Sequence, residues 1–301
     1  MRLQGIKGPS YRLHNGNTKE ISNMQNEALS RPIDVSDDIC SHVQPHIHAW
    51  TKTYGRNFLQ WYGVQPVLVV TEPELCKEIL NNKDGVYPKQ KPKKLGKKLL
   101  GDCISMADGE KWVKLRKVSN HAFHGDSLNV SPLLARGSKK RGDAVVWQSD
   151  SKLRWPCQSQ KRMSMIMNET LRLYPPAVLI VRKVAREVRL GNLLLPANME
   201  LLFPPLAIHH EAQFWGQVAG LFKPDRLSEG AAKATNDNMA AFMPFGMMGP
   251  RMCVGFNFAT AEIKIALSMI LQRHSFTPSP GYVHSPFQFM TLRPLHRVHE
   301  K

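Results

Sequence analysis

Hydrophobic and polar positions follow several different periods along the first part of the chain, and each period predicts an element. Residues 33–54 are compatible with a helix, and residues 57–71 alternate in the manner of a β-hairpin. Residues 72–81 then resume a helical spacing, with Thr71 and Glu74 placed as a capping box. Residues 1–130 are therefore predicted to form several helices with a little strand.

The second part of the chain shows longer periodic segments. Helical spacing covers residues 108–123, 163–174 and 256–273, and the middle helix is stopped by Pro175 and Pro176. Apolar strands are predicted at 177–184, 189–195 and 199–203, with a turn at Gly191 and Asn192, and a terminal hairpin at 283–298. Residues 131–160 show no sustained period and are predicted to be an irregular junction between 1–130 and 161–301.

Charge and cysteine content narrow the class of protein. The formal net charge of +17 suggests an acidic binding partner, such as a nucleic acid or an acidic protein. Nucleic-acid binding is disfavoured, because the sequence contains neither zinc-ligand spacings nor nucleic-acid-binding motifs. An acidic protein is therefore the expected partner. Five widely spaced cysteines suggest a reducing compartment rather than a disulfide framework. His42, His46 and His48 lack the context of a metal site and are expected to lie on the surface or to serve packing.

One short stretch carries the strongest chemical signal. Cys253 lies between Gly249 and Gly255, two residues after Arg251 and just before the helical period that begins at Phe256. Glycines let the backbone lie close to a large ligand, and a helix N-terminus favours negative charge, so this sulfur is suited to be a thiolate ligand. The alternative is a buried structural cysteine.

The stretch resembles the haem-binding loop of the cytochromes P-450, whose pattern is F-x-x-G-x-R-x-C-x-G. The matching positions are Phe245, Gly249, Arg251, Cys253 and Gly255. Met247 and Met248 lengthen the first gap of the pattern by one residue, so the resemblance places the cysteine more firmly than the Phe245 ring. It implies a haem cofactor whose iron has Cys253 as its axial thiolate, and a thiolate of this kind favours O–O bond cleavage.

Three further residues match positions that contact haem propionates in this family. Trp112 and Arg116 lie four residues apart on one helix face, and Arg182 follows in a predicted strand. An arginine fork and an indole N–H both suit a carboxylate. The alternatives are a surface helix anchored by its tryptophan, and a strand arginine that reaches solvent.

A second motif resembles the E-x-x-R element of the family. Glu169 and Arg172 lie one helical turn apart, and Arg226 matches the arginine that completes a buried structural triad in the family. An i, i+3 pair of this kind is more often a surface salt bridge of about 0–1 kcal/mol. The resemblance assigns the triad to the integrity of the fold and of the haem site, and not to the chemistry.

The resemblance covers residues 1–130 and 161–301 and implies a mainly α fold with a small β-sheet (α+β). An A/G-G-x-D/E-T-T segment, which marks the oxygen-pocket helix of the family, is absent from the sequence. The chain is therefore predicted to lack several central helices, including that one. The chain resembles plant members of a clan that includes terpenoid- and hormone-modifying enzymes, and above all the branch that starts Gly-Ile-Lys-Gly-Pro-Ser-Tyr-Arg. This resemblance implies a role in plant secondary metabolism.

By resemblance the chain is a monooxygenase that inserts one atom of O2 into a small lipophilic substrate. The partner implied is an NADPH-cytochrome reductase, and the location implied is the endoplasmic reticulum membrane. The sequence contains no window of about 20 apolar residues, and residues 2–11 resemble the start of the catalytic domain after an anchor. The alternative function is a truncated, non-catalytic haem-binding remnant.

Overall fold

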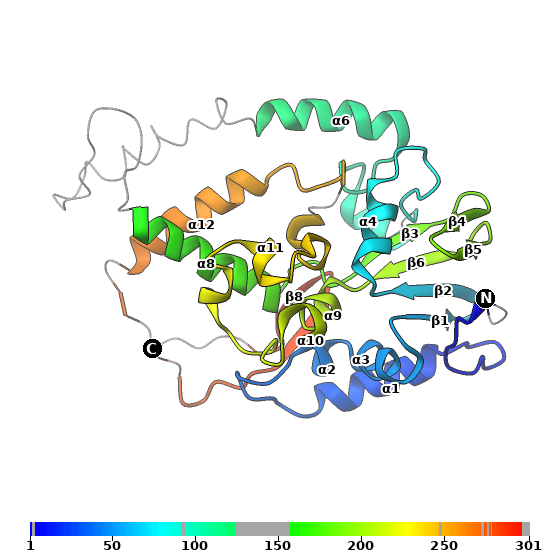
Figure 1. The fold of residues 1–301 in the computed structure, drawn as a ribbon, viewed down its shortest axis with the longest axis horizontal. Coiled ribbons are helices and arrows are strands. Elements are labelled where there is room, and N and C mark those ends of the chain that lie inside the picture. Colours follow the sequence, from blue (N-terminus) through cyan, green and yellow to red (C-terminus); the bar gives the residue numbers. More distant parts are fainter. Residues whose placement is uncertain are drawn as a thin grey trace.

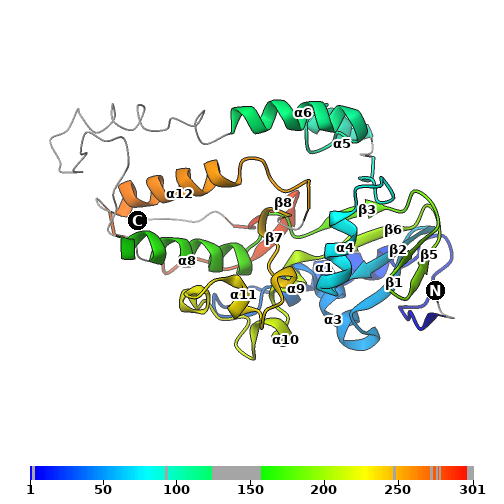
Figure 2. The ribbon, with the colours of Figure 1, turned by 45° about the horizontal axis from the view of Figure 1, so that its top comes forward.

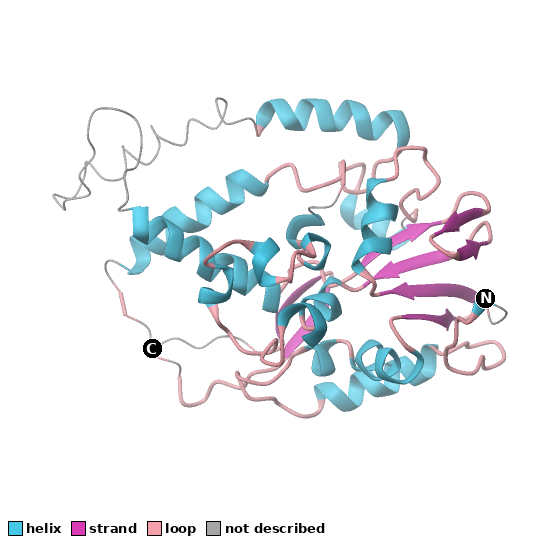
Figure 3. Ribbon diagram, viewed as in Figure 1, coloured by secondary structure: helices cyan, strands magenta, loops and turns pink. Residues whose placement is uncertain are grey.

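The structure is a computed structural model that describes residues 1–301 apart from 2–3, 92–93, 124–156, 247–248, 272–273, 276, 278 and 297–301. Helices and a small sheet mix in one chain, as predicted (Figure 1, Figure 3). The helices are α1 (Thr18–Leu29), α2 (Cys40–Val43), α3 (Pro45–Tyr54), α4 (Pro73–Asn81), α5 (Lys94–Leu100), α6 (Gly109–Ala122), α8 (Cys157–Leu173), α9 (Pro205–His209), α10 (Ala212–Trp215), α11 (Ala231–Ala234) and α12 (Phe256–Leu271). Short 3-10 turns are η2 (Pro224–Leu227), η3 (Met239–Ala241) and η4 (Pro244–Gly246).

The main sheet joins strands from both halves of the chain. Its strand order is β1 (Asn57–Tyr62), β2 (Gln65–Val70), β6 (Glu200–Phe203) and β3 (Ile180–Lys183). The β1–β2 hairpin is confirmed, and its turn includes Gly63 at a φ of 59°. The two halves meet where β2 and β6 lie side by side (Figure 1). These strands pair in parallel, with Leu68 opposite Leu201.

The alternation of side chains places the two faces of this sheet against different helices. Val67 and Val69 point into one apolar cluster, and Leu68 and Val70 point into another. The first cluster includes side chains of α1 and α3, namely Ile21, Ile47 and Trp50. The second includes α4 and later segments, through Cys76, Ile79, Phe203 and Trp215. Because β2 is buried on both faces, its apolar residues form an almost continuous run.

Two expectations for the first part of the chain are corrected. The helix expected over residues 33–54 is broken into α2 and α3, because Pro45 disfavours helical backbone at Gln44, whose φ and ψ are −131° and 57°. The capping box at Thr71 and Glu74 does not form. The Thr71 hydroxyl donates instead to the carbonyl of Arg56 at 2.7 Å, and Glu72 takes the cap position without a side-chain cap hydrogen bond.

The predicted elements of the second part are present. Small antiparallel hairpins join β4 (Val188–Leu190) to β5 (Leu193–Leu195) and β7 (Pro286–Phe289) to β8 (Thr291–Pro294). Helix α8 begins at Cys157, so residues 157–160 of the predicted irregular junction are helical, in agreement with the good helix propensity of Gln158 and Gln160. The rest of that junction, 131–156, lies outside the described residues.

Helices α6 and α12 are long, yet almost none of their described residues is buried against the rest of the protein. None of the residues of α6, all of which the structure describes, is buried, and α6 lies along one margin of the molecule in both views (Figure 1, Figure 2). Ser268 is the one buried residue of α12, whose residues are likewise all described. Within the described ranges, no helix combines the length and the apolar character needed to cross a bilayer.

Candidate functional site

The loop that carries Cys253 is closed by a hydrogen bond across its base. The backbone N–H of Cys253 donates to the carbonyl oxygen of Phe245 at 2.9 Å, and Cys253 itself is exposed three residues before α12. Phe245 has a left-handed φ of 59°, a costly conformation for a non-glycine residue, and its ring packs edge-on against Phe256 with centroids 5.2 Å apart. The two methionines at 247 and 248 lie outside the described residues.

The two glycines of the loop differ in what surrounds them. A Cβ added to Gly249 would stand 2.2 Å from the carbonyl oxygen of Leu80, because the loop packs directly on the backbone at the end of α4. A Cβ on Gly255 would meet nothing nearer than the Phe123 ring at 3.6 Å, an ordinary contact. Gly249 is therefore required by the fold, whereas the described contacts of Gly255 leave room for a side chain.

Arg251 ties the loop to the segment that begins α6. Its Nη1 donates to the carbonyl of Ala107 at 3.1 Å, and its Nη2 pairs with the carboxylate of Asp108. Its guanidinium also lies over the Trp112 ring, 4.4 Å from the centroid. Such cation–π contacts are attractive and hold the two side chains in a fixed relation.

Arg116 adds a second link between α6 and the loop. Its Nη1 donates to the carbonyl of Met252, the residue directly before Cys253, and its Nε donates to Asn120 at 2.9 Å. Trp112 and Arg116 therefore both face the cysteine loop, as their i, i+4 spacing predicts. Neither side chain is buried, so Trp112 does not anchor a surface helix to the core.

Arg182 reaches the same place from the sheet. Burial lowers the pKa of its guanidinium to about 10, and the nearby positive charge of Arg251 acts in the same direction, against the opposing effect of Asp108. Its Nη1 donates to the carbonyl of Val181 at 2.9 Å. Arg182 is half-buried beside other charges and does not extend into solvent.

Sequence reasoning did not identify two members of this group, Lys89 and Asp108. An isolated antiparallel bridge pairs Lys89 with Arg182, and the Lys89 backbone N–H donates to the Asp108 carboxylate at 3.3 Å. Burial lowers the pKa of Lys89 to about 8, with the charges of Arg251 and Arg182 acting in the same direction. Two features of the sequence could have pointed to these residues. Lys89 begins a basic run, and Asp108 is an acidic residue directly before α6.

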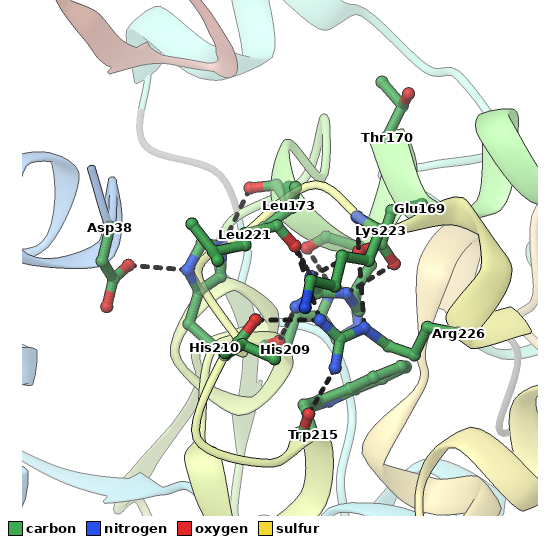
Figure 4. A network of polar contacts seen from close by, with 12 residues as sticks. Asp38, Glu169, Thr170, Leu173, His209, His210, Trp215, Leu221, Lys223 and Arg226 are labelled. Carbon is green, nitrogen blue, oxygen red and sulfur yellow. Dashed lines mark hydrogen bonds and ion pairs between the residues drawn. The ribbon is translucent and has the colours of Figure 1, made fainter. Parts of the chain in front are cut away.

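The structure also brings the three residues of the structural triad together, and Figure 4 shows Glu169 and Arg226 within this network. Arg172 donates from Nε and Nη2 to the two carboxylate oxygens of Glu169 at 2.9 and 2.8 Å, and both side chains are fully buried. Arg226 approaches Glu169 with its Nε 3.5 Å from Oε1, and its Nη1 donates to the carbonyl of Trp215 at 2.5 Å. Burial lowers the pKa of Arg226, and the charge of Arg172 lowers it further.

His209 connects this network to the chain just before the cysteine loop. The backbone N–H of Met243 donates to its Nε2 at 3.0 Å, so Nδ1 carries the ring proton and donates to the carbonyl of Arg172 at 3.0 Å. Burial lowers the pKa of His209 to about 3, which keeps the ring neutral. Arg172 in turn donates to the His209 carbonyl at 2.7 Å. The triad thereby fixes the segment that leads to Phe245.

Comparison with known proteins gives a consistent result. A family model described as Cytochrome P-450 matches residues 40–151 and 143–296. Cytochrome P-450 CYP749A22 of Panax ginseng is 34% identical over 468 aligned positions, which cover 98% of this chain and 89% of that protein. Cytochrome P-450 72A68 of Medicago truncatula is 25% identical over 99% of this chain and 91% of its own length.

These alignments are longer than the chain. They run over 468 and 477 positions against 301 residues, so each contains long gaps on the side of this chain. The two matches of the family model meet at residues 143–151, within the predicted junction.

Proposed function

The chain belongs to the cytochrome P-450 family, and we propose that it is a haem-thiolate monooxygenase in which Cys253 is the axial ligand. The cofactor of the family is a haem whose iron is held by a cysteine thiolate. When bound, this group supplies the activation of O2 and the insertion of one oxygen atom into a substrate. The proposed substrate is a small lipophilic molecule, and the proposed source of electrons is an NADPH-dependent reductase.

The chemistry of the side chains around Cys253 fits this cofactor. Arg251 lies two residues before the cysteine, and Arg116 donates to the carbonyl of Met252, the residue directly before it. Arg182, whose pKa is lowered by burial and by the charge of Arg251, adds a third guanidinium. A haem carries two propionate carboxylates, and guanidinium forks are suited to bind them. We propose that Arg251, Arg116 and Arg182 neutralise these carboxylates and that the Trp112 indole N–H donates a hydrogen bond to them. Their convergence from three separate segments on the cysteine loop is the observation that carries the proposal.

The other matched residues are proposed to shape the loop. Gly249 allows the loop to pack on Leu80, and the Phe245 carbonyl holds the backbone of Cys253. A Cβ at Gly255 would come no closer than ordinary contact with the ring of Phe123. Glu169, Arg172 and Arg226 are proposed to hold this half of the fold in place.

The surface of α6 supports the proposed electron donor. Lys111, Lys114 and Lys117 are exposed on the helix whose Arg116 contacts the cysteine loop. A basic surface so near the proposed cofactor suits an acidic electron-transfer protein, and we propose an NADPH-cytochrome reductase. The same partner would place the chain at the endoplasmic reticulum membrane.

A second candidate function is that of a non-catalytic remnant that lacks the central helices of the family. It is supported by the missing A/G-G-x-D/E-T-T segment and by the little cover of α12. Ile263, Met269 and Leu271 are between 39% and 57% exposed on this apolar helix, so α12 leaves apolar surface uncovered.

The absorption spectrum of the reduced chain with carbon monoxide tests the proposal. Purified chain supplemented with haem is compared with Cys253→Ala and with Cys103→Ala. Cys103 is the suitable control because its thiol is also not buried and a hydrogen bond with the Ser105 hydroxyl lowers its pKa. A thiolate-type Soret band that only Cys253→Ala loses supports the haem site.

Turnover then separates the two candidates. The loaded chain is mixed with reductase, NADPH and O2, and NADPH consumption and product formation are followed. Product supports the monooxygenase, whereas a thiolate spectrum without product favours the remnant. A spectrum unchanged by Cys253→Ala would contradict both, because it would exclude Cys253 as the ligand.

A further inference from the structure

The cationic group beside the cysteine loop contains a single carboxylate among the described residues, that of Asp108. Its Oδ1 pairs with Arg251, and its Oδ2 accepts from the backbone N–H of Lys89 at 3.3 Å. The side chains of Arg182 and Lys89 come from segments that the Lys89–Arg182 bridge pairs. We call Lys89, Arg182 and Arg251 the cation cluster.

The position of Asp108 shows that its carboxylate is diverted from its usual partner. Asp108 is the N-cap residue of α6, and aspartate at this position ordinarily accepts a hydrogen bond from the first turn. Here its side chain makes no cap hydrogen bond, although its backbone is extended as an N-cap requires. The carboxylate has therefore two alternative partners, the first turn of α6 and the cation cluster.

The cation cluster carries more positive charge than Asp108 balances. Burial and mutual repulsion lower the pKa values of Lys89 and Arg182 to about 8 and about 10. The Lys89 ammonium donates to the carbonyl of Ser105 at 2.7 Å, a neutral acceptor that adds no negative charge. A ligand carboxylate at this place would gain from all three cations.

We propose that Asp108 is an internal competitor of a ligand carboxylate for Arg251, and that Lys89 is a further carboxylate-binding residue of the same cluster. When the ligand carboxylate pairs with Arg251, the Asp108 side chain turns to cap α6. The proposal rests on the proposed function, in which the ligand is haem and its propionates are the carboxylates. It adds two affinity-determining residues, one that opposes cofactor binding and one that favours it.

The test is a haem titration of the full chain, followed by the Soret band and by quenching of tryptophan fluorescence. Asp108→Asn keeps the size of the side chain and its ability to cap but removes the charge that holds Arg251. It is expected to lower the Kd for haem about tenfold, or about 1.4 kcal/mol. Asp102→Asn is the matched control, because Asp102 pairs with Lys111 at 2.7 Å outside the cluster, and its Kd is expected within about twofold of wild type.

A second ligand, haem dimethyl ester, tests whether the effect depends on the propionate carboxylates. Haem dimethyl ester carries esterified propionates, so wild type and Asp108→Asn are expected to bind it equally. Lys89→Met is expected to weaken haem about tenfold and to leave the ester unchanged. Asp108→Ser, which retains a capping hydroxyl, is expected to show the same gain in haem affinity as Asp108→Asn. It keeps the test valid if one of the two variants does not fold.

Two results would overturn this inference and leave the proposed function standing. One is wild-type haem affinity in Asp108→Asn while the Soret band still depends on Cys253. The other is an equal gain for haem and for its ester. Failure of wild type and of both Asp108 variants to bind haem would overturn the inference together with the proposed function.

Discussion

Arg172 donates to both oxygens of the Glu169 carboxylate from one helical turn away, and both side chains are fully buried. Figure 4 shows Glu169 within this network. The remaining donors of Arg172 point to backbone carbonyls, among them that of His209 at 2.7 Å. Its guanidinium also lies 4.9 Å from the centre of the Trp215 ring. One buried ion pair thus connects α8, α9 and α10.

Removing the charge of Glu169 is expected to destabilise the chain strongly. Glu169→Gln leaves the Arg172 guanidinium buried without a counter-charge, and such a loss costs about 3–5 kcal/mol. Urea unfolding followed by circular dichroism gives the free energy of unfolding. Glu187→Gln, at an exposed position, is the control and is expected to change that free energy by less than about 0.5 kcal/mol. Equal small losses in both variants would show that the buried pair contributes little.

Acid is expected to destabilise the chain through His46. Burial lowers the pKa of this histidine to about 4, and its ring packs against Trp50 with centroids 5.6 Å apart. Its pKa is higher in the unfolded chain, near 6.5, so the unfolded chain binds more protons as pH falls below 6.5. The contribution to stability is therefore complete above about pH 6.5 and is lost progressively toward about pH 4.

His46→Phe tests this titration. Wild type is expected to lose about 2 kcal/mol more than His46→Phe between about pH 7.5 and about pH 5.0, in urea unfolding measured at both values. His121→Gln, at an exposed position on α6, is expected to follow wild type. If His46→Phe loses as much stability as wild type on acidification, His46 is not the group that titrates.

The two glycines of the cysteine loop are expected to respond differently to the same added methyl group. Gly249→Ala brings a Cβ to 2.2 Å from the Leu80 carbonyl oxygen, and backbone must shift to relieve the clash, at a cost of about 1–3 kcal/mol. Gly255→Ala meets only the Phe123 ring at 3.6 Å and should cost less than about 1 kcal/mol. Thermal unfolding of the chain without added haem gives both values. A larger loss for Gly255→Ala would contradict this packing of the loop.

Association of the chain is expected to depend on the exposed apolar side chains in the last turn of α12. Met269 and Leu271 are 48% and 57% exposed, and their replacement by Lys removes apolar surface without opening a core. The double variant should bind less of a hydrophobic dye and sediment with less self-association. Ala266→Lys adds charge at another exposed position of the helix while removing little apolar surface, and should change both much less. An unchanged double variant would place the associating surface elsewhere.

Sequence alone determined most of the local structure and the chemistry of the loop. Periods of two and of 3.6 residues predicted the β1–β2 hairpin and helices α6, α8 and α12, because these patterns depend on neighbouring residues. The spacing of Trp112 and Arg116 placed both on one face for the same reason. The residue types around Cys253 are by themselves enough to suggest a thiolate ligand, since two glycines, an arginine and a following helix all lie within a few positions of the sulfur.

Tertiary structure decided which distant residues share the site. Lys89, Asp108, Arg182 and Arg251 meet only because the sheet pairs one segment with another and the loop packs on the start of α6. The clash that Gly249 avoids also depends on this packing, since Leu80 lies far from it in sequence. Local propensity carries no information about contacts between remote segments, and burial and electrostatic balance arise only once those segments are packed together.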